Sequence, residues 1–147
     1  MKKFLLIFGI VLLSRVISFG QLSGETEIKS TIDQLFDGIR ANDSLLIQPI
    51  VHQTCTLQTI QNNKDGNVII SKTEMAAFIK SVGTKRAGVQ LDERLSGYDI
   101  KIDGDMATVW TPYSFFVNNN FSHCGVNAFT LIRQNDSWKI LSIDTQI

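Results

Sequence analysis

Residues 95–147 decide the fold, and they read LSGYDIKIDGDMATVWTPYSFFVNNNFSHCGVNAFTLIRQNDSWKILSIDTQI. Stretches of alternating apolar and polar residues, typical of β-strands, are separated here by short polar turns. The Asp103-Gly104 turn is a strong hairpin signal, because both residue types tolerate positive φ. The expected strands are 95–102, 105–117, 121–133 and 138–147. Strands this close in sequence form an antiparallel meander, and one face of that sheet needs a cover.

Helices predicted earlier in the chain supply that cover. Apolar residues at 28, 32, 35, 36 and 39 recur with helical spacing. They predict an amphipathic helix that starts from an N-cap at Ser23 and runs to about Ala41. A second, shorter helix is predicted over 44–51, after Asn42 and Asp43.

A strand pair and a third helix are expected in the middle of the chain. The predicted strands are 53–60 and a brief returning strand, 68–70. Ser71 and Glu74 have the spacing of a capping box, which predicts a helix that ends near Gly83. The expected fold class is therefore α+β: a curved, mixed, mostly antiparallel sheet forming a cone, with about three helices packed on its concave face.

The N-terminus has the organisation of a secretory signal. A lysine pair precedes an apolar run at 4–13, and the small residue Gly20 follows. We therefore predict a signal peptide over 1–20 and one exported domain over 21–147, periplasmic or extracellular. The alternative is a retained membrane anchor, which the shortness of the run and the interrupting Arg15 disfavour.

Charge and motif content narrow the function classes. Removal of the signal leaves eleven basic and fourteen acidic residues, a net charge of −3, so we expect no nucleic acid partner. After cleavage of the signal we expect no membrane partner either. The two histidines and two cysteines have no chelating spacing, and the sequence has no glycine-rich phosphate loop, so no metal or cofactor is predicted.

Cys55 and Cys124 either form one bridge or remain buried free thiols.

Several segments resemble the nuclear transport factor 2-like superfamily, which also holds ketosteroid isomerases and SnoaL-type polyketide cyclases. They are the helix at 28–39 with the following Asn-Asp-Ser, the segment DGDMATV at 103–109 and the ending WKILSIDT at 138–145. The stretch FSHCGVN at 121–127, with Phe129, Leu131 and Trp138 downstream, is similar to exported bacterial proteins described as lumazine-binding. The resemblance covers essentially all of the mature chain. It implies an internal cavity and a homodimer through the outer face of the sheet, but no reaction.

Strand alternation gives a testable register for the meander. A three-residue turn at 118–120 would place Phe115 opposite His123, Tyr113 opposite Gly125 and Thr111 opposite Asn127. A two-residue turn at 135–136 would place Leu131 opposite Ile140 and Asn127 opposite Asp144. One face would then carry Thr111, Tyr113, Phe115, His123, Asn127, Phe129, Ile140 and Asp144. The other would carry Trp110, Ser114, Phe116, Cys124, Val126, Ala128 and Ile143.

Polar and aromatic members of the first face are the candidate site residues. Asp144 and His123 are the predicted catalytic groups, because a buried carboxylate or an imidazole makes a general acid or base. The predicted ligand-binding residues are Tyr113, Phe115, Asn127, Thr111, Phe129 and, at the mouth of the cone, His52. A structural interpretation stands beside each one: hydrogen bonds to solvent for Asp144 and His123, and to the backbone for Asn127.

Two functions from different classes follow. The first is a non-catalytic domain that holds a small, largely apolar or aromatic ligand, which nine phenylalanines and few ionisable residues on the cavity face favour. The second is a cofactor-independent isomerase or cyclase, in which Asp144 or His123 moves a proton while Tyr113 or Asn127 polarises a carbonyl. A structural or assembly role is a third interpretation.

Overall fold

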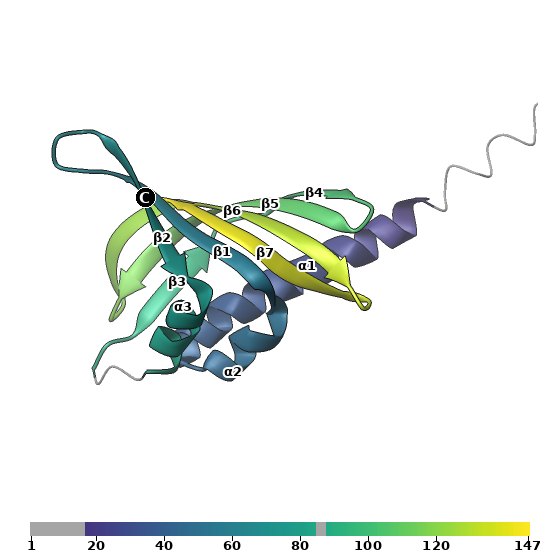
Figure 1. The fold of residues 1–147 in the computed structure, drawn as a ribbon, viewed down its shortest axis with the longest axis horizontal. Coiled ribbons are helices and arrows are strands. Elements are labelled where there is room, and N and C mark those ends of the chain that lie inside the picture. Colours follow the sequence, from purple (N-terminus) through teal and green to yellow (C-terminus); the bar gives the residue numbers. More distant parts are fainter. Residues whose placement is uncertain (1–16, 85–87) are drawn as a thin grey trace, which may run out of the picture.

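A computed structural model describes the backbone of residues 17–84 and 88–147, and side chains from residue 23 onward within those ranges (Figure 1). The elements are α1 (Ile17–Ala41), α2 (Ser44–Ile47), the 3-10 turn η1 (Gln48–Ile50), β1 (Val51–Asn62), β2 (Val68–Glu74), α3 (Met75–Gly83), β3 (Leu91–Leu95), β4 (Asp99–Asp103), β5 (Met106–Val117), β6 (Asn120–Gln134) and β7 (Ser137–Gln146). Of the predicted signal, residues 1–16 lie outside the described residues, and 17–20 belong to the start of α1.

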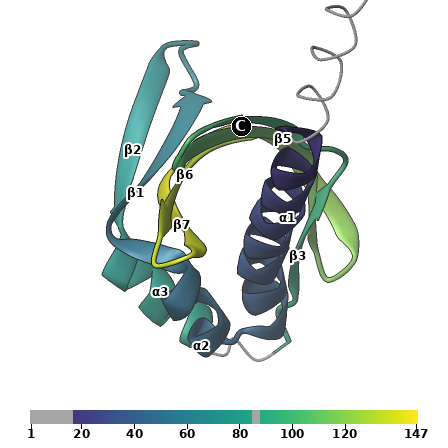
Figure 2. The same cartoon turned by 90° about the vertical axis from the view of Figure 1, so that its right-hand side faces the viewer.

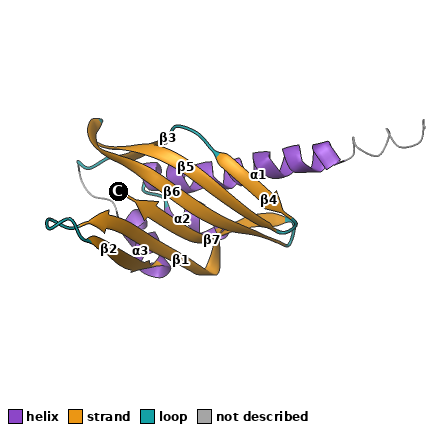
Figure 3. Ribbon diagram, turned by 90° about the horizontal axis from the view of Figure 1, so that it is seen from above, coloured by secondary structure: helices purple, strands orange, loops and turns teal. Residues whose placement is uncertain are grey.

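Seven strands form one mixed sheet in the order β2-β1-β7-β6-β5-β3, with β4 also paired to β5. Every pairing is antiparallel except the parallel pairing of β1 with β7. Figure 2 shows the sheet curving around α1, and in Figure 3 the strands lie in front of the helices. The predicted α+β cone, with three helices on the concave face of a curved sheet, is confirmed.

The core lies between the concave face and the apolar stripe of α1. Ile28, Ile32, Leu35 and Phe36 are buried, as the helical spacing predicts. The ring of Phe36 meets Phe129 of β6 edge to face, with the centroids 6.3 Å apart. No helix among the described residues is long and apolar enough to cross a membrane.

Two predicted helix starts were wrong. Ser23 lies inside α1, where its hydroxyl donates to Glu27 Oε1 at 3.1 Å, so it is not an N-cap. Ser71 and Glu74 belong to β2, because β1 is long enough to pair with them, and α3 begins at Met75 without a side-chain cap. The ladder of backbone hydrogen bonds with β1 replaces the expected capping box.

The second predicted helix and the first strand of the meander were also partly wrong. The helix expected over 44–51 consists of α2 and the turn η1, and Val51 already begins β1. The strand expected over 95–102 is two strands, β3 and β4, which pair with different parts of β5. Pro112 of β5 has no N–H, and its carbonyl instead accepts from the Ser96 backbone N–H at 2.9 Å, so the ladder breaks between the two strands.

The predicted register between β5 and β6 is confirmed, although its assumed cause was wrong. Phe115 pairs with His123, Tyr113 with Gly125 and Thr111 with Asn127. The turn has two residues, Asn118 and Asn119, both with positive φ, where three were predicted. A bulge next to Phe115 supplies the missing residue and restores the expected offset.

Between β6 and β7, the predicted register is correct near the turn and wrong beyond it. Leu131 pairs with Ile140, as expected from the two-residue turn. A bulge between Thr130 and Leu131 then shifts the rest of the ladder by one residue, so Asn127 pairs with Thr145 instead of Asp144. A shift of one residue exchanges the two faces of a strand, which turns Asp144 outward and Ile143 into the core.

Candidate functional site

Polar side chains gather on the concave face where β3, β5, β6 and β7 lie side by side. The paired rows are Glu93–Phe115–His123, then Leu95–Tyr113–Gly125, then Thr111–Asn127–Thr145. The next row, Val109–Phe129–Ile143, is apolar and buried. The site therefore begins where the apolar core ends, and we call the residues of its three rows the Glu93 site.

Asn127 is the fixed centre of this site. It is 3% exposed, and its Nδ2 donates to Glu93 Oε1 at 2.6 Å. Thr145 Oγ1 donates to Asn127 Oδ1 at 2.7 Å, which sets the orientation of the amide. Thr111, fully buried, donates its hydroxyl to the Asn127 carbonyl at 3.5 Å. Asn127 therefore has its amide held from two sides and presents a rigid donor to Glu93.

Glu93 has an unusual protonation equilibrium for a glutamate. Burial raises the pKa of its carboxyl to about 7, although the hydrogen bond from Asn127 favours the charged form and works against this shift. The described residues offer Glu93 no cation that its carboxyl oxygens contact. The carboxyl is therefore divided between its acid and base forms at neutral pH, which suits proton exchange or recognition of a polar ligand group.

Tyr113 adds a neutral phenol beside this carboxyl. Its side chain is 4% exposed, and burial followed by the charge of Glu93 raises the pKa of its hydroxyl to about 12, so it stays protonated. The phenol lies over Gly125: a Cβ there would be 2.7 Å from the phenol oxygen and 2.1 Å from the Gln146 carbonyl oxygen. None of the described residues hydrogen-bonds to the Tyr113 hydroxyl, which leaves it as a donor for a ligand.

Two further rings belong to the site. His123 stands edge to face with Tyr113, with centroids 5.9 Å apart, and its ring is tilted by 31° over Phe115 at 5.0 Å. The His123 Nδ1 atom lies 3.1 Å from Ser122 Oγ. The His123 ring therefore packs against its neighbours through aromatic contacts, and it gives the site a flat, partly exposed surface.

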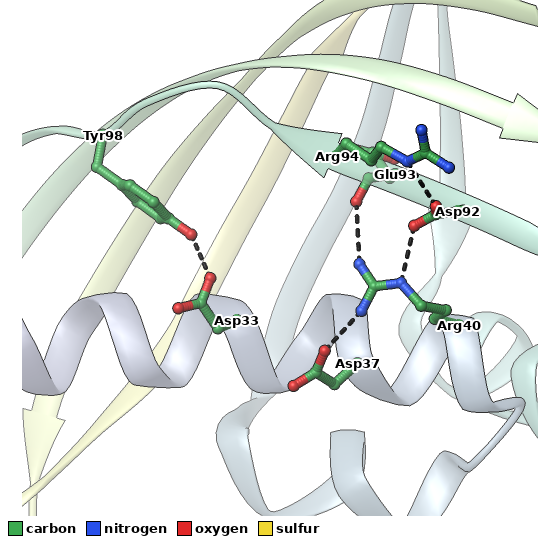
Figure 4. A network of polar contacts seen from close by, with 7 residues as sticks. All are labelled: Asp33, Asp37, Arg40, Asp92, Glu93, Arg94 and Tyr98. Atoms are coloured by element: carbon green, nitrogen blue, oxygen red, sulfur yellow. Dashed lines mark hydrogen bonds and ion pairs between the residues drawn. The ribbon is translucent and has the colours of Figure 1, made fainter. Parts of the chain in front are cut away.

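An ion network holds the strand that carries Glu93 (Figure 4). Arg40 of α1 contacts Asp92 Oδ1 at 2.7 Å, and its Nη2 donates to the Glu93 carbonyl at 3.5 Å. Arg94 contacts Asp92 Oδ2, also at 2.7 Å. The hydrogen bond from Arg40 is the main reason that the pKa of Asp92 is below its usual range. Both neighbours of Glu93 are therefore anchored, one of them directly to α1.

Glu93 was not among the predicted site residues. Its strand, LDERL, carries three consecutive charged residues, and only Leu95 of it lies within the predicted meander. The alternation of Leu91, Glu93 and Leu95 on one face was the available sign, since it places a glutamate among inward-facing leucines. Its burial depends on α1 and β6, which no local pattern contains.

Asp144 does not reach the Glu93 site, contrary to its predicted position. It pairs with Ala128 on the outer face of the sheet, and its Oδ1 accepts from Gln58 Nε2 of β1 at 3.1 Å. The bulge next to Thr130 is the physical reason. The carboxylate expected on the concave face is instead supplied by Glu93.

His52 and Phe129, predicted as ligand-binding residues, lie outside the cluster. His52 stands at the start of β1, where its Nδ1 contacts Thr54 Oγ1 at 2.7 Å. Its neighbour Val51 pairs with Ile140, toward the opposite end of the face from Asn127. Phe129 is 2% exposed and packed in the core against α1.

The cysteines and acidic residues form no further site. Cys55 is buried and free, and burial raises the pKa of its thiol to about 11, which keeps it unreactive. Cys124 is free and exposed. Among the described residues, no three histidine, cysteine, aspartate or glutamate side chains gather closely enough to hold a metal ion.

Comparisons with known proteins identify the fold. No protein-family model and no curated protein matches the chain. A nuclear transport factor 2-like protein with a cystatin-like fold from Novosphingobium aromaticivorans aligns with a TM-score of 0.70 and 16% identity, over 89% of this chain and 86% of that one. A nuclear transport factor 2-like superfamily protein from Salmonella enterica aligns with a TM-score of 0.64 and 16% identity, over 85% and 91%. A Mycobacterium tuberculosis protein of unknown function aligns with a TM-score of 0.67 and 16% identity, over 86% and 72%.

These alignments show that the chain has the nuclear transport factor 2-like fold, as its sequence predicted. Identities this low carry the likeness no further than the fold. The narrower resemblance to lumazine-binding proteins stays a prediction, and function has to be argued from the Glu93 site itself.

Proposed function

We propose that this protein binds a small, largely apolar or aromatic molecule on the concave face of its sheet, with the Glu93 site recognising one polar group of that molecule. The observation that carries this proposal is the Glu93 carboxyl, which is partly buried beside a rigid amide and contacts no cation among the described residues. Burying such a group costs free energy, and native proteins keep it mainly where it has a role.

The surroundings of Glu93 favour a flat ligand. Tyr113, Phe115 and His123 offer ring faces and edges, while Leu95 adds an aliphatic side chain. The second carboxyl oxygen of Glu93 and the hydroxyl of Tyr113 have no partner among the described residues. An aromatic or apolar body would contact the rings, and its polar group would bond to those two atoms.

A fragment screen by saturation-transfer NMR tests the proposal. A library of neutral and anionic aromatic fragments is screened against the wild type, Glu93→Gln and Asp144→Asn. We expect hits on the wild type to lose affinity at least tenfold in Glu93→Gln and to keep it in Asp144→Asn, because Asp144 faces the outer side of the sheet. Hits that bind all three proteins equally would refute the site, as would a screen without hits.

The pKa of Glu93 favours proton transfer as a second candidate function. With a pKa of about 7, the carboxylate would take a proton from a carbon next to a ligand carbonyl and return it to another carbon of the same ligand. The Tyr113 hydroxyl would donate a hydrogen bond to the carbonyl oxygen while negative charge builds there. Glu93 thus replaces Asp144 and His123 in the role that the sequence analysis gave them.

Hydrogen–deuterium exchange at carbon distinguishes catalysed proton transfer from binding alone. Ketone-bearing hits from the screen are incubated with the protein in D2O, and deuterium uptake at carbon is followed by proton NMR. Uptake that the wild type catalyses and Glu93→Gln does not would support proton transfer. Binding without catalysed uptake would leave the binding function and end the enzymatic one.

We also propose that the mature protein is exported, on the strength of the lysine pair and the short apolar run before residue 21. Expression of the full chain in a bacterium, followed by fractionation and N-terminal sequencing, tests this. A periplasmic or secreted protein that begins at Gln21 is the expected result. An uncleaved chain in the membrane fraction would favour the retained anchor.

A further inference from the structure

The strand β2 presents an exposed and regular edge. It is the last strand of the sheet, and all seven of its residues are exposed. Its register with β1 runs without a bulge from Val68 to Glu74, so the backbone groups on its other side keep the regular alternation of an antiparallel strand. Figures 1 and 2 show the β1–β2 hairpin extending beyond the rest of the sheet. An edge of this kind is a template for another strand.

The side chains of β2 make this edge apolar at one end. Val68, Ile69 and Ile70 follow one another with exposed fractions of 67%, 39% and 64%. Three consecutive β-branched aliphatic residues put apolar surface on both faces of the strand. Sheets commonly protect edge strands with proline, a bulge or a central charge, and β2 has none of these before Lys72.

We propose that β2 pairs in antiparallel fashion with β2 of a second copy of this chain, about a two-fold axis at Ile69, so that two sheets join into one.

The sequence of β2 is complementary to itself in this register. Ile69 lies opposite the partner's Ile69, and Val68 lies opposite the partner's Ile70, so every aliphatic residue meets another. Moving the axis by one residue, to Ile70, would place Val68 opposite the partner's Lys72 and Ile69 opposite the partner's Ser71. Only the pairing centred on Ile69 buries all three aliphatic residues against their own kind.

Charge is compatible with the same register. The chain turns back toward β1 between Asn63 and Asn67, so the paired stretch ends at this turn. Lys72 comes level with the partner's Gly66, so no like charges face each other. The joint would have an apolar centre and a charged rim, the arrangement usual in protein interfaces. The two bodies would lie at opposite ends of the joined hairpins.

The outer face of the sheet, which the resemblance predicts as the dimer interface, is less suited to dimerisation than the β2 edge. Trp110 is 53% exposed there, but the same face carries Asp144 and Gln58, already hydrogen-bonded to each other, and rows of threonine and serine. The backbone of its central strands is fully paired within the sheet, whereas β2 has unpaired backbone groups as well as apolar side chains. The β2 edge can therefore form both backbone hydrogen bonds and apolar contacts with a second copy, whereas the outer face can form only side-chain contacts.

Disulfide trapping tests the register. In a Cys124→Ser background, Ile69→Cys places the two new thiols directly opposite each other, within reach of a disulfide. Ser71→Cys is the matched control on the same strand, since it would lie opposite the partner's Asn67 and about 13 Å from the partner's own residue 71. Mild oxidation of dilute protein should crosslink at least tenfold more of Ile69→Cys than of Ser71→Cys. Equal crosslinking of the two would overturn the register.

Sedimentation equilibrium tests the interface without cysteines. The wild type should be a dimer, Ile69→Lys should raise the dimer dissociation constant at least tenfold, and Trp110→Arg should leave it unchanged. Circular dichroism checks that both variants are folded. A monomeric wild type would overturn the proposal. So would a dimer that Trp110→Arg dissociates and Ile69→Lys does not, and that result would support the outer face instead.

Discussion

Replacing Glu93 with glutamine should make the protein more stable at high pH and change little at low pH. The gap between 4.5, the ordinary pKa of a glutamate, and about 7 in the fold corresponds to about 3 kcal/mol. The folded protein keeps this proton up to about pH 7, while the unfolded chain releases it near pH 4.5. Because the folded state binds more protons in this window, the free energy of unfolding falls as pH rises from 4.5 to 7.

Glutamine keeps the shape of Glu93 and an oxygen for the Asn127 amide, but it cannot ionise. The free energy of unfolding of Glu93→Gln, relative to the wild type, should therefore rise by up to about 3 kcal/mol between pH 4 and pH 8. The gain should be complete shortly above pH 7. Urea unfolding at half-unit steps of pH, followed by tryptophan fluorescence, measures this difference.

The control is Glu74→Gln, since the Glu74 side chain is 80% exposed. Its stability should follow that of the wild type across the whole range. If the curve of Glu93→Gln also runs parallel to that of the wild type, Glu93 titrates like an exposed glutamate. The account of a buried, uncompensated carboxyl would then be refuted.

Three other substitutions test the packing and the anchoring of the site, each measured by urea unfolding. Thr145→Val should cost about 1–3 kcal/mol of stability, since it leaves the buried Asn127 Oδ1 without a hydrogen-bond donor. A loss below roughly 0.5 kcal/mol would mean that solvent reaches the amide. Gly125→Ala should cost about 1–3 kcal/mol, because the new methyl would meet the Gln146 carbonyl, and a neutral result would show that this strand end moves freely. Asp92→Asn should cost about 1–3 kcal/mol of stability, because the arginines stabilise the ionised form of Asp92. The loss should fade as pH falls below 3.8, where Asp92 begins to be protonated in the unfolded chain, and a loss that stays unchanged in acid would contradict the ion pairing.

The fold could be predicted because its determinants are local. The turn predicted at Asp103-Gly104 forms one residue later, at Gly104-Asp105, because Asp103 still pairs with Met106, and the turn predicted at Asn135-Asp136 is correct. Gly104, Asn135 and Asp136 adopt the positive φ that their residue types tolerate. The apolar stripe that begins at Ile28 then specifies a helix to cover the sheet. Alternation along β5 and β6 even places Tyr113 and Asn127 on the correct face.

The site was harder to predict, because single residues inserted in a strand change which side chains face inward. One bulge beside Phe115 compensated for a turn of the wrong length, while another beside Thr130 moved Asp144 to the outer face. Neither bulge has a glycine or another local marker in the sequence. The burial of Glu93 comes from tertiary contacts: Arg40 anchors its strand to α1, and Asn127 arrives from β6.

Carbon-13 NMR of protein with labelled glutamate side chains follows the titration of the Glu93 carboxyl carbon, and so measures directly whether this group keeps its proton near neutral pH. The resonance is assigned by its absence in Glu93→Gln. We expect a midpoint near pH 7 for Glu93. A Glu93 midpoint near 4.5 would contradict the account, since a carboxyl that ionises as it does in water is neither buried nor equipped for the role proposed here.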